Sequence, residues 1–320
     1  MDIKKITLKL LSLIFSSLII YSFLIIFQNS SKAESCYRDA NNKIVIGEID
    51  STPVSHGSGA PYDKDSCQEE PLNYKVKFFR VMLCTSETYV SDDDPEFSTC
   101  TDIFNQDSGK DIVISPGTKS NLFSSGSNIS LPIGTFGYMT MILSSHLGIK
   151  HYETYALANG NDATIKGYGD SFSTGTVCWT VDSYTTYTGY SDDLHGQSIR
   201  TGSPSDSTTL GVECGTEAER TSNGTYTYTY EIIDNIHDSC DPDCDTNGNF
   251  RAWVNSSDTG LGFSAAATLL QSDGITLGTD RDDAVRIGYH IAFDTSLTIS
   301  EDTKTFDMSF NTSGSVSIDF

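Results

Sequence analysis

Eight cysteines, all after residue 33, constrain the fold of this chain more than any other sequence feature. The residues before them have the form of an export signal: basic residues at Lys4 and Lys5, an apolar run over 10–27 and a small-x-small cleavage site at 31–33. An even number of cysteines in an oxidising compartment favours disulfides over free thiols or zinc. We therefore expect an exported protein, which is secreted, periplasmic or held at the cell surface.

The apolar run leaves one alternative open. A run of about 18 residues can just span the hydrocarbon core of a membrane. Residues 1–33 are accordingly expected to be a signal peptide or an N-terminal anchor, and no other membrane contact is expected.

The spacing of the cysteines predicts how they pair. No two of them have the C-x-x-C spacing of a structural zinc site. Loop-closure entropy is lowest for cysteines close in sequence. The predicted disulfides are Cys36–Cys67, Cys84–Cys100, Cys178–Cys214 and Cys240–Cys244.

The charge of the chain excludes one class of partner. Its 43 acidic and 20 basic side chains give a net charge of −23. Such a surface repels phosphate backbones and anionic lipid headgroups. We therefore expect no nucleic-acid partner, and a protein or glycan partner at the cell surface instead.

Alternating apolar and polar residues predict strands along most of the chain. Residues 73–84 alternate with a change of phase at Phe78 and Phe79, which predicts a bulge or a strand that becomes buried on both faces. Other strands are expected at 134–143, 147–157, 175–181, 226–232, 250–254, 285–293, 306–310 and 316–320. Helices are expected only at 265–271 and 231–237. This pattern predicts an all-β fold of antiparallel, immunoglobulin-like β-sandwiches with long loops and few short helices.

The length after the signal segment exceeds that of a usual single domain. Glycine and asparagine interrupt the strand pattern over 158–170. We therefore expect a first β-sandwich domain at 34–160 and a second β-rich domain at 161–320.

A short motif resembles a known family. Leu131-Pro-Ile-Gly-Thr-Phe136, which leads into an alternating strand, is similar to the LPxGxY turn of transthyretin-like and carboxypeptidase-regulatory-like β-sandwich modules. The resemblance covers residues 73–157, with Phe136 in place of the tyrosine. It implies an immunoglobulin-like sandwich with an exported, surface-associated role and no catalytic residues.

The segment DSCDPDCDTNGNF over 238–250 is similar to the first half of a calcium-binding loop. Its metal ligands would be Asp241, Asp243, Asp245 and Asn247, because calcium prefers several oxygen ligands on a tight loop. Val254 stands where an EF-hand needs a bidentate glutamate. We expect a turn supported by the Cys240–Cys244 disulfide, and leave open whether it also holds Ca²⁺.

No catalytic motif was found: the chain has no HExxH, no GxSxG and no P-loop. The leading hypothesis is therefore a structural or interaction protein rather than an enzyme. One alternative is a carbohydrate-binding or glycan-cleaving protein, with a groove lined by Trp179, Trp253 or tyrosines. Another is an outer-membrane β-barrel, because the chain ends in an alternating strand at Phe320.

Overall fold

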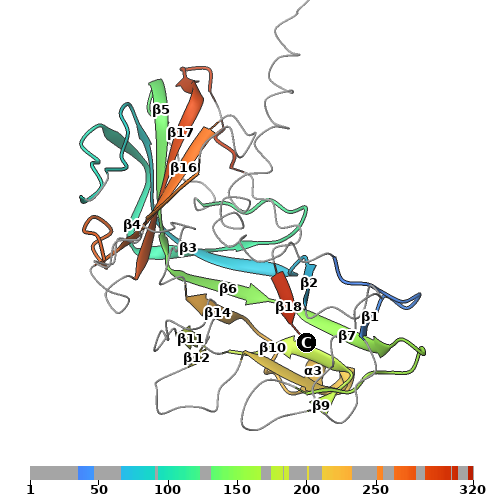
Figure 1. Ribbon diagram of the computed structural model, residues 1–320. Helices are drawn as coiled ribbons and strands as arrows, with labels where there is room; N and C mark the ends of the chain where they lie inside the picture. The colour runs from blue at the N-terminus through green and yellow to red at the C-terminus, as the bar shows by residue number, and fades with distance from the viewer. Residues whose placement is uncertain are drawn as a thin grey trace, which may run out of the picture.

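Figure 1 shows the computed structural model of the chain, in which strands dominate. It describes residues 35–46, 66–90, 93–122, 131–166, 174–182, 184–186, 200–201, 211–232, 251–254, 263–278, 285–303, 305–308 and 316–319. The elements are β1 (Ile44–Ile46), β2 (Ser66–Glu69), β3 (Asn73–Cys84), β4 (Cys100–Ile114), β5 (Gly134–Ser144), β6 (His146–Lys150), β7 (Tyr152–Leu157), β8 (Ile165–Lys166), β9 (Thr174–Gly175), β10 (Val177–Thr180), β11 (Tyr184–Thr186), β12 (Arg200–Thr201), β13 (Val212–Gly215), α3 (Glu217–Ser222), β14 (Thr229–Ile232), β15 (Arg251–Val254), β16 (Phe263–Leu270), β17 (Arg286–Ile299) and β18 (Val316–Asp319).

The larger sheet is organised around β3. The order of strands in this sheet is β12-β11-β14-β6-β3-β5-β17-β16-β15. Strand β4 pairs with the edge of β3 that is opposite to β6 and β5. The first residues of β3 pair with β6, and the part from Phe78 to its end pairs with β5. The register shifts between Phe78 and Arg80, which confirms the predicted bulge. Strand β3 therefore links the two groups of strands seen in the upper and lower halves of Figure 1.

The smaller sheet has the order β1-β7-β10-β13. Strands β7, β10 and β13 are antiparallel, whereas β1 runs parallel to β7. Strand β7 follows β6 directly after His151, so a single stretch of chain passes from one sheet to the other. The two sheets pack against each other, and the protein is an all-β sandwich as the sequence predicted.

The larger sheet buries side chains on both faces at β5, β16 and β17. One face carries the main apolar core, which includes Val81, Met141, Leu269 and Ile287. The opposite face carries a second, smaller cluster that includes Met82, Ile142 and Leu270, and residues from the 85–99 and 271–278 connections pack against it. Burial on both faces is the reason why the end of β3 reads as a continuous apolar run.

Three disulfides connect described residues: Cys36–Cys67, Cys84–Cys100 and Cys178–Cys214. These are the pairs that sequence proximity predicted. Two of them join residues that lie directly opposite each other on neighbouring antiparallel strands, β3 with β4 and β10 with β13. The predicted Cys240–Cys244 pair lies outside the described residues.

The structure corrects one expected helix. Residues 265–271 were expected to be helical, but 263–270 form β16, which is hydrogen-bonded to β15 on one side and β17 on the other. Alanine and leucine are strong helix formers, but pairing with the two neighbouring strands overrides this preference. Of the other expected helix, 231–232 belong to β14 and the rest lies outside the described residues.

Two further differences concern short segments. Residues 305–308 form no strand, although the alternating phenylalanines predicted one at 306–310. The short helix α3 was not predicted. It begins with a capping box, in which the Thr216 hydroxyl accepts a hydrogen bond from the Glu219 N–H and the Glu219 carboxylate accepts one from the Thr216 N–H.

Strands from both sides of the expected domain boundary share the larger sheet: β5 pairs with β17, and β6 pairs with β14. The larger sheet is therefore not divided at residue 160. None of the described helices has the length and apolar character needed to cross a membrane.

A cavity-forming substitution should test the core. Leu269 of β16 is fully buried in the main apolar core, so Leu269→Ala should lower the free energy of unfolding by about 2–5 kcal/mol. Ile133→Ala is the control, because the Ile133 side chain is 65% exposed and its truncation should cost less than about 0.5 kcal/mol. Chemical denaturation of both variants measures the difference. Equal losses would contradict this description of the core.

Candidate functional site: an aromatic–cation ladder

An alternating row of tyrosine and basic side chains crosses the outward face of the strands β14, β6 and β3 and continues to α3 and the start of β7. In spatial order it contains Tyr230, Lys75, Tyr228, Lys150, Tyr226, Arg220 and Tyr152. We call this row the aromatic–cation ladder. Its basic residues come from β3, β6 and α3, and its tyrosines come from β7, β14 and the residues just before β14.

Strand register places the first part of the ladder. On β3, Lys75 alternates with buried Tyr74 and Val76, so its side chain points away from the core. Lys75 lies opposite Gly148 of β6, and Gly148 lies opposite Tyr230 of β14. The three residues therefore form one row across three strands.

Gly148 allows Lys75 and Tyr230 to meet above the strand between them. A Cβ atom at residue 148 would lie 3.0 Å from Lys75 Cβ and 3.1 Å from Tyr230 Cε1. Both distances are tighter than ordinary van der Waals contacts. Lys75 and Tyr230 can therefore contact each other only because Gly148 has no side chain.

Each basic group lies between two tyrosine rings. Lys75 Nζ is 5.0 Å from the ring centre of Tyr228 and 5.1 Å from that of Tyr230. Lys150 Nζ is 4.3 Å from the ring of Tyr226 and 6.0 Å from that of Tyr228. These distances lie within the range of cation–π attraction.

Helix α3 provides the third cation. The Arg220 guanidinium lies 4.0 Å from the ring centre of Tyr152 and 5.0 Å from that of Tyr226. Arg220 Nε also donates a hydrogen bond to Glu217 Oε2 at 2.8 Å. The capped first turn of α3 therefore orients Arg220 over the end of the ladder.

The protonation states follow from the surroundings. A hydrogen bond with Tyr230 raises the pKa of Lys75, so this lysine stays charged at neutral pH. Burial raises the pKa of Tyr226 to about 12 and also raises the pKa of Tyr228. Near neutral pH the rings of Tyr226 and Tyr228 are therefore neutral, whereas Lys75 is positively charged.

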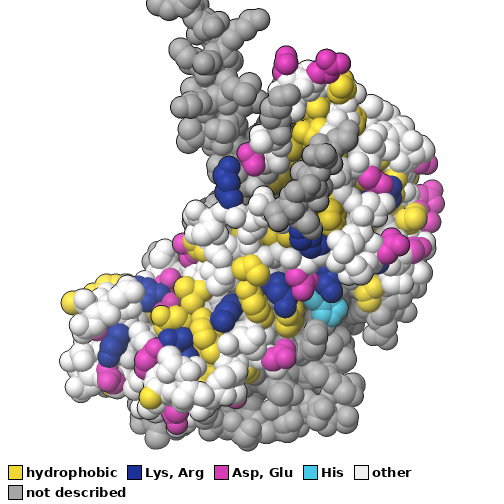
Figure 2. Space-filling model, turned by 180° about the vertical axis from the view of Figure 1, so that it is seen from behind, with side chains coloured by type: hydrophobic (Ala, Val, Ile, Leu, Met, Phe, Trp, Pro, Cys, Tyr) yellow, Lys and Arg dark blue, Asp and Glu magenta, His cyan; other side chains and the backbone are white. Residues whose placement is uncertain are grey.

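Two of these positive charges, those of Lys75 and Lys150, form no ion pair with a carboxylate in the described part of the chain, although Asp111 acts on Lys75 at longer range. Among the described residues, no carboxylate lies within ion-pair distance of Lys75 or Lys150. By contrast, Lys43 and Lys119 pair with Asp162 and Asp307. Figure 2 shows basic side chains gathered between hydrophobic ones across the middle of one face. In a chain of net charge −23, Lys75 and Lys150 are thus two positive groups that form no ion pair among the described residues.

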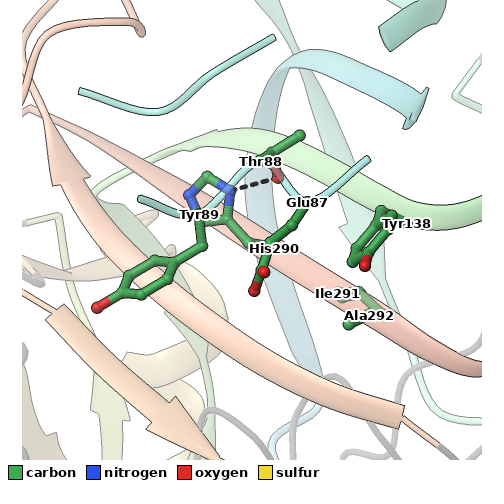
Figure 3. A pocket seen from close by; sticks show the side chains of 7 residues that line it. All are labelled: Glu87, Thr88, Tyr89, Tyr138, His290, Ile291 and Ala292. Atoms are coloured by element: carbon green, nitrogen blue, oxygen red, sulfur yellow. Dashed lines mark hydrogen bonds between the residues drawn. The ribbon is translucent and has the colours of Figure 1, made fainter. Parts of the chain in front are cut away.

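A second polar site surrounds His290, beside a shallow pocket lined by Glu87, Thr88, Tyr89, Tyr138, His290, Ile291 and Ala292 (Figure 3). His290 Nδ1 lies 2.9 Å from the Thr88 hydroxyl, and Nε2 lies 2.9 Å from the Thr268 hydroxyl. The Thr88 hydroxyl also lies 2.7 Å from that of Thr140. These contacts satisfy both ring nitrogens.

The surroundings of His290 indicate a structural role. His290 is buried, and so are the three threonines, so no substrate reaches their polar atoms. The Phe97 ring stacks on the imidazole at 6.3 Å between ring centres. Thr88 and Phe97 both belong to the connection closed by the Cys84–Cys100 disulfide. His290 therefore anchors this connection to the sheet.

A third polar site is an ion cluster in the smaller sheet. The Arg38 guanidinium donates two hydrogen bonds to the Glu153 carboxylate, at 2.9 and 2.6 Å, and one to Glu69 at 3.2 Å. Burial opposes ionisation of Glu153, but contacts with His151 and Arg38 outweigh it and lower the pKa of its carboxyl. A general acid for glycoside cleavage needs a raised pKa. The cluster instead fastens the segment before β1 to β7.

The residues predicted as sites from sequence are placed as follows. The calcium ligands Asp241, Asp243, Asp245 and Asn247 lie outside the described residues, so calcium binding stays a prediction. Within the described part, no group of three or more His, Cys, Asp or Glu side chains is arranged to hold a metal.

Trp179 does not line a groove. Its side chain is buried in a small cluster with Val177 and Val181, and its Nε1–H donates a hydrogen bond to the Thr225 hydroxyl at 3.1 Å. The side chain of Trp253 is outside the described part of the structure. The tyrosines at 226, 228 and 230, which alternate in the sequence, do form a surface.

Comparison of the chain with protein-family models, curated proteins and solved structures found no match. The resemblance of residues 73–157 to transthyretin-like modules therefore stays a prediction.

Filling the gap at Gly148 should strain the ladder. Gly148→Ala should lower the free energy of unfolding by about 1–3 kcal/mol, because the new methyl group is forced against Lys75 and Tyr230. Gly137→Ala in β5 is the matched control, since a Cβ there would meet only Ser296 Oγ at 3.9 Å. Urea denaturation compares the two. A Gly148→Ala variant as stable as the control would contradict the close approach.

The buried imidazole should make stability depend on pH. Burial lowers the pKa of His290 from 6.5 to about 3, so between these values the unfolded chain binds a proton that the folded chain does not. Stability should therefore fall as the pH decreases from 6.5, by up to about 1.4 kcal/mol per pH unit from this residue.

His290→Gln removes this titration and keeps a side chain that hydrogen-bonds. Its free energy of unfolding, measured from pH 7 to pH 4, should fall less steeply than that of the wild type. Parallel pH profiles would show that His290 is not held neutral in the fold.

Proposed function

We propose that this protein is an exported, disulfide-stabilised binding protein and that the aromatic–cation ladder is its contact surface. The observation that carries the proposal is the pair of lysines, Lys75 and Lys150, which face outward without a carboxylate partner among the described residues. Tyrosine and arginine, which the ladder also contains, are enriched at protein contact sites.

The scaffold supports this proposal. The three disulfides fit an oxidising compartment outside the cytosol. Hydrogen-bonded strands carry most of the ladder, so its side chains are held on a rigid support. The other two polar sites, at His290 and Arg38, fasten segments to the sheets and leave the ladder as the outward-facing group of interacting side chains described above.

A binding panel tests the proposal. The purified, oxidised protein is immobilised and exposed to neutral polysaccharides, acidic polysaccharides and acidic and basic polypeptides, with biolayer interferometry as the readout. We expect Lys150→Gln combined with Tyr228→Leu to weaken binding to the retained polymer by about tenfold or more. The panel also includes chromogenic glycan, ester and peptide substrates, none of which should be hydrolysed.

The control is Lys43→Gln combined with Ile133→Ala, which changes one charged and one apolar residue outside the ladder. Thermal unfolding establishes that both variants fold. If binding is the same in the ladder variant and the control, the ladder is not the contact surface. Turnover of any substrate would point to an enzyme instead.

A further inference from the structure

We infer that the ligand of the ladder is an anionic polysaccharide, whose sugar rings carry carboxylate or sulfate groups. This inference rests on the proposed function and adds the chemical class of the ligand. It follows from what occupies the tyrosine faces, from the linear order of the charges and from the position of the ladder on the sheet.

The faces of the tyrosines are already in contact with cations. Lys75 lies over Tyr228 and Tyr230, and Lys150 lies over Tyr226. A neutral sugar that stacked on these rings would have to displace the ammonium groups. An anionic group can instead pair with the ammonium groups where they stand, so the ladder favours a charged ligand.

The three positive groups follow one another in a fixed order across the surface. Lys75, Lys150 and Arg220 follow one another along the ladder, each separated from the next by one tyrosine. A linear polymer with anionic groups at intervals matches such a row. Charges on a compact partner need not lie in a line, so this order favours an extended chain.

The position of the ladder distinguishes a polysaccharide from an acidic peptide. Extended peptides commonly bind by adding a strand to the edge of a sheet, where backbone hydrogen bonds are available. The ladder crosses the face of β3, β6 and β14, and these strands are already paired with their neighbours. The face offers side-chain charges rather than free backbone groups, and an anionic sugar polymer can pair with these charges.

The negative net charge of the chain limits the charge density that a ligand of the ladder can have. A duplex nucleic acid carries one charge per ~1.7 Å of its axis and would be repelled by the acidic surface around the ladder. Repulsion between exposed charges is screened beyond about 8–10 Å at physiological salt. A polysaccharide with one charge or fewer per sugar ring can therefore contact the lysines while most of the acidic surface is screened from it.

The test uses polymers that share one backbone. Unmodified dextran is compared with carboxymethyl-dextran and dextran sulfate, both substituted to no more than one charged group per sugar ring, and with poly-glutamate as an acidic peptide. We expect the protein to bind carboxymethyl-dextran or dextran sulfate, and to bind dextran at least about tenfold more weakly. Raising the salt to about 0.5 M should reduce binding of the acidic forms.

Two double variants separate the ladder from overall charge. Lys75→Gln with Lys150→Gln should weaken binding of the acidic dextran by about tenfold or more. Lys43→Gln with Lys119→Gln removes the same number of positive charges at sites already paired with carboxylates, and should change binding by less than about twofold. Thermal unfolding of both double variants shows that each is folded.

The outcomes distinguish an anionic polysaccharide from a neutral polysaccharide and from an acidic peptide. Binding of one acidic dextran alone supports the inference and identifies the anionic group. Binding of all three dextrans alike, with loss in the Lys75→Gln and Lys150→Gln variant, keeps the ladder as the contact surface but overturns the anionic ligand. Binding of poly-glutamate without the acidic dextrans identifies an acidic peptide instead. Absence of binding to every acidic dextran also overturns the inference.

Discussion

The pairing of β3 with strands on both sides is the constraint on which the larger sheet depends. One side of β3 is hydrogen-bonded to β4 over nearly its whole length, whereas the other side is shared between β6 and β5. The change from β6 to β5 falls between Lys75 and Phe78, and the bulge between Phe78 and Arg80 follows directly after it. Bulges bend a strand and increase its twist. The bulge at Phe78 therefore lies next to the place where β3 passes from the part of the sheet that carries the ladder to the part that holds most of the main core.

The sequence predicted those features that depend on local pattern. Alternation located β3, β5 and most of β17, and the change of phase at Phe78 located the bulge. Proximity in the chain was enough to predict the three disulfides among described residues. The strand at β16 was misjudged, because its run of alanines and leucines has helical propensity and its strand conformation depends on neighbours distant in sequence.

The ladder could be predicted only in part. The alternation of Tyr226, Tyr228 and Tyr230 was visible in the sequence, but the cations come from three distant segments. Only strand register brings Lys75 next to Tyr230 across Gly148. The same holds for His290, whose hydrogen-bond partners Thr88 and Thr268 come from two other segments. Pairing between distant segments is the information that local periodicity lacks.

The ladder reaches beyond the larger sheet. Strands β6 and β7 meet at His151, and the ladder continues from Lys75 in the larger sheet to Tyr152 at the start of the smaller one. Its side chains thus lie on both sides of His151, where the chain passes from the larger to the smaller sheet. Any tilt of one sheet relative to the other would alter the spacing between Lys75 and Arg220. The distance between positive charges on this surface is therefore tied to the angle between the sheets.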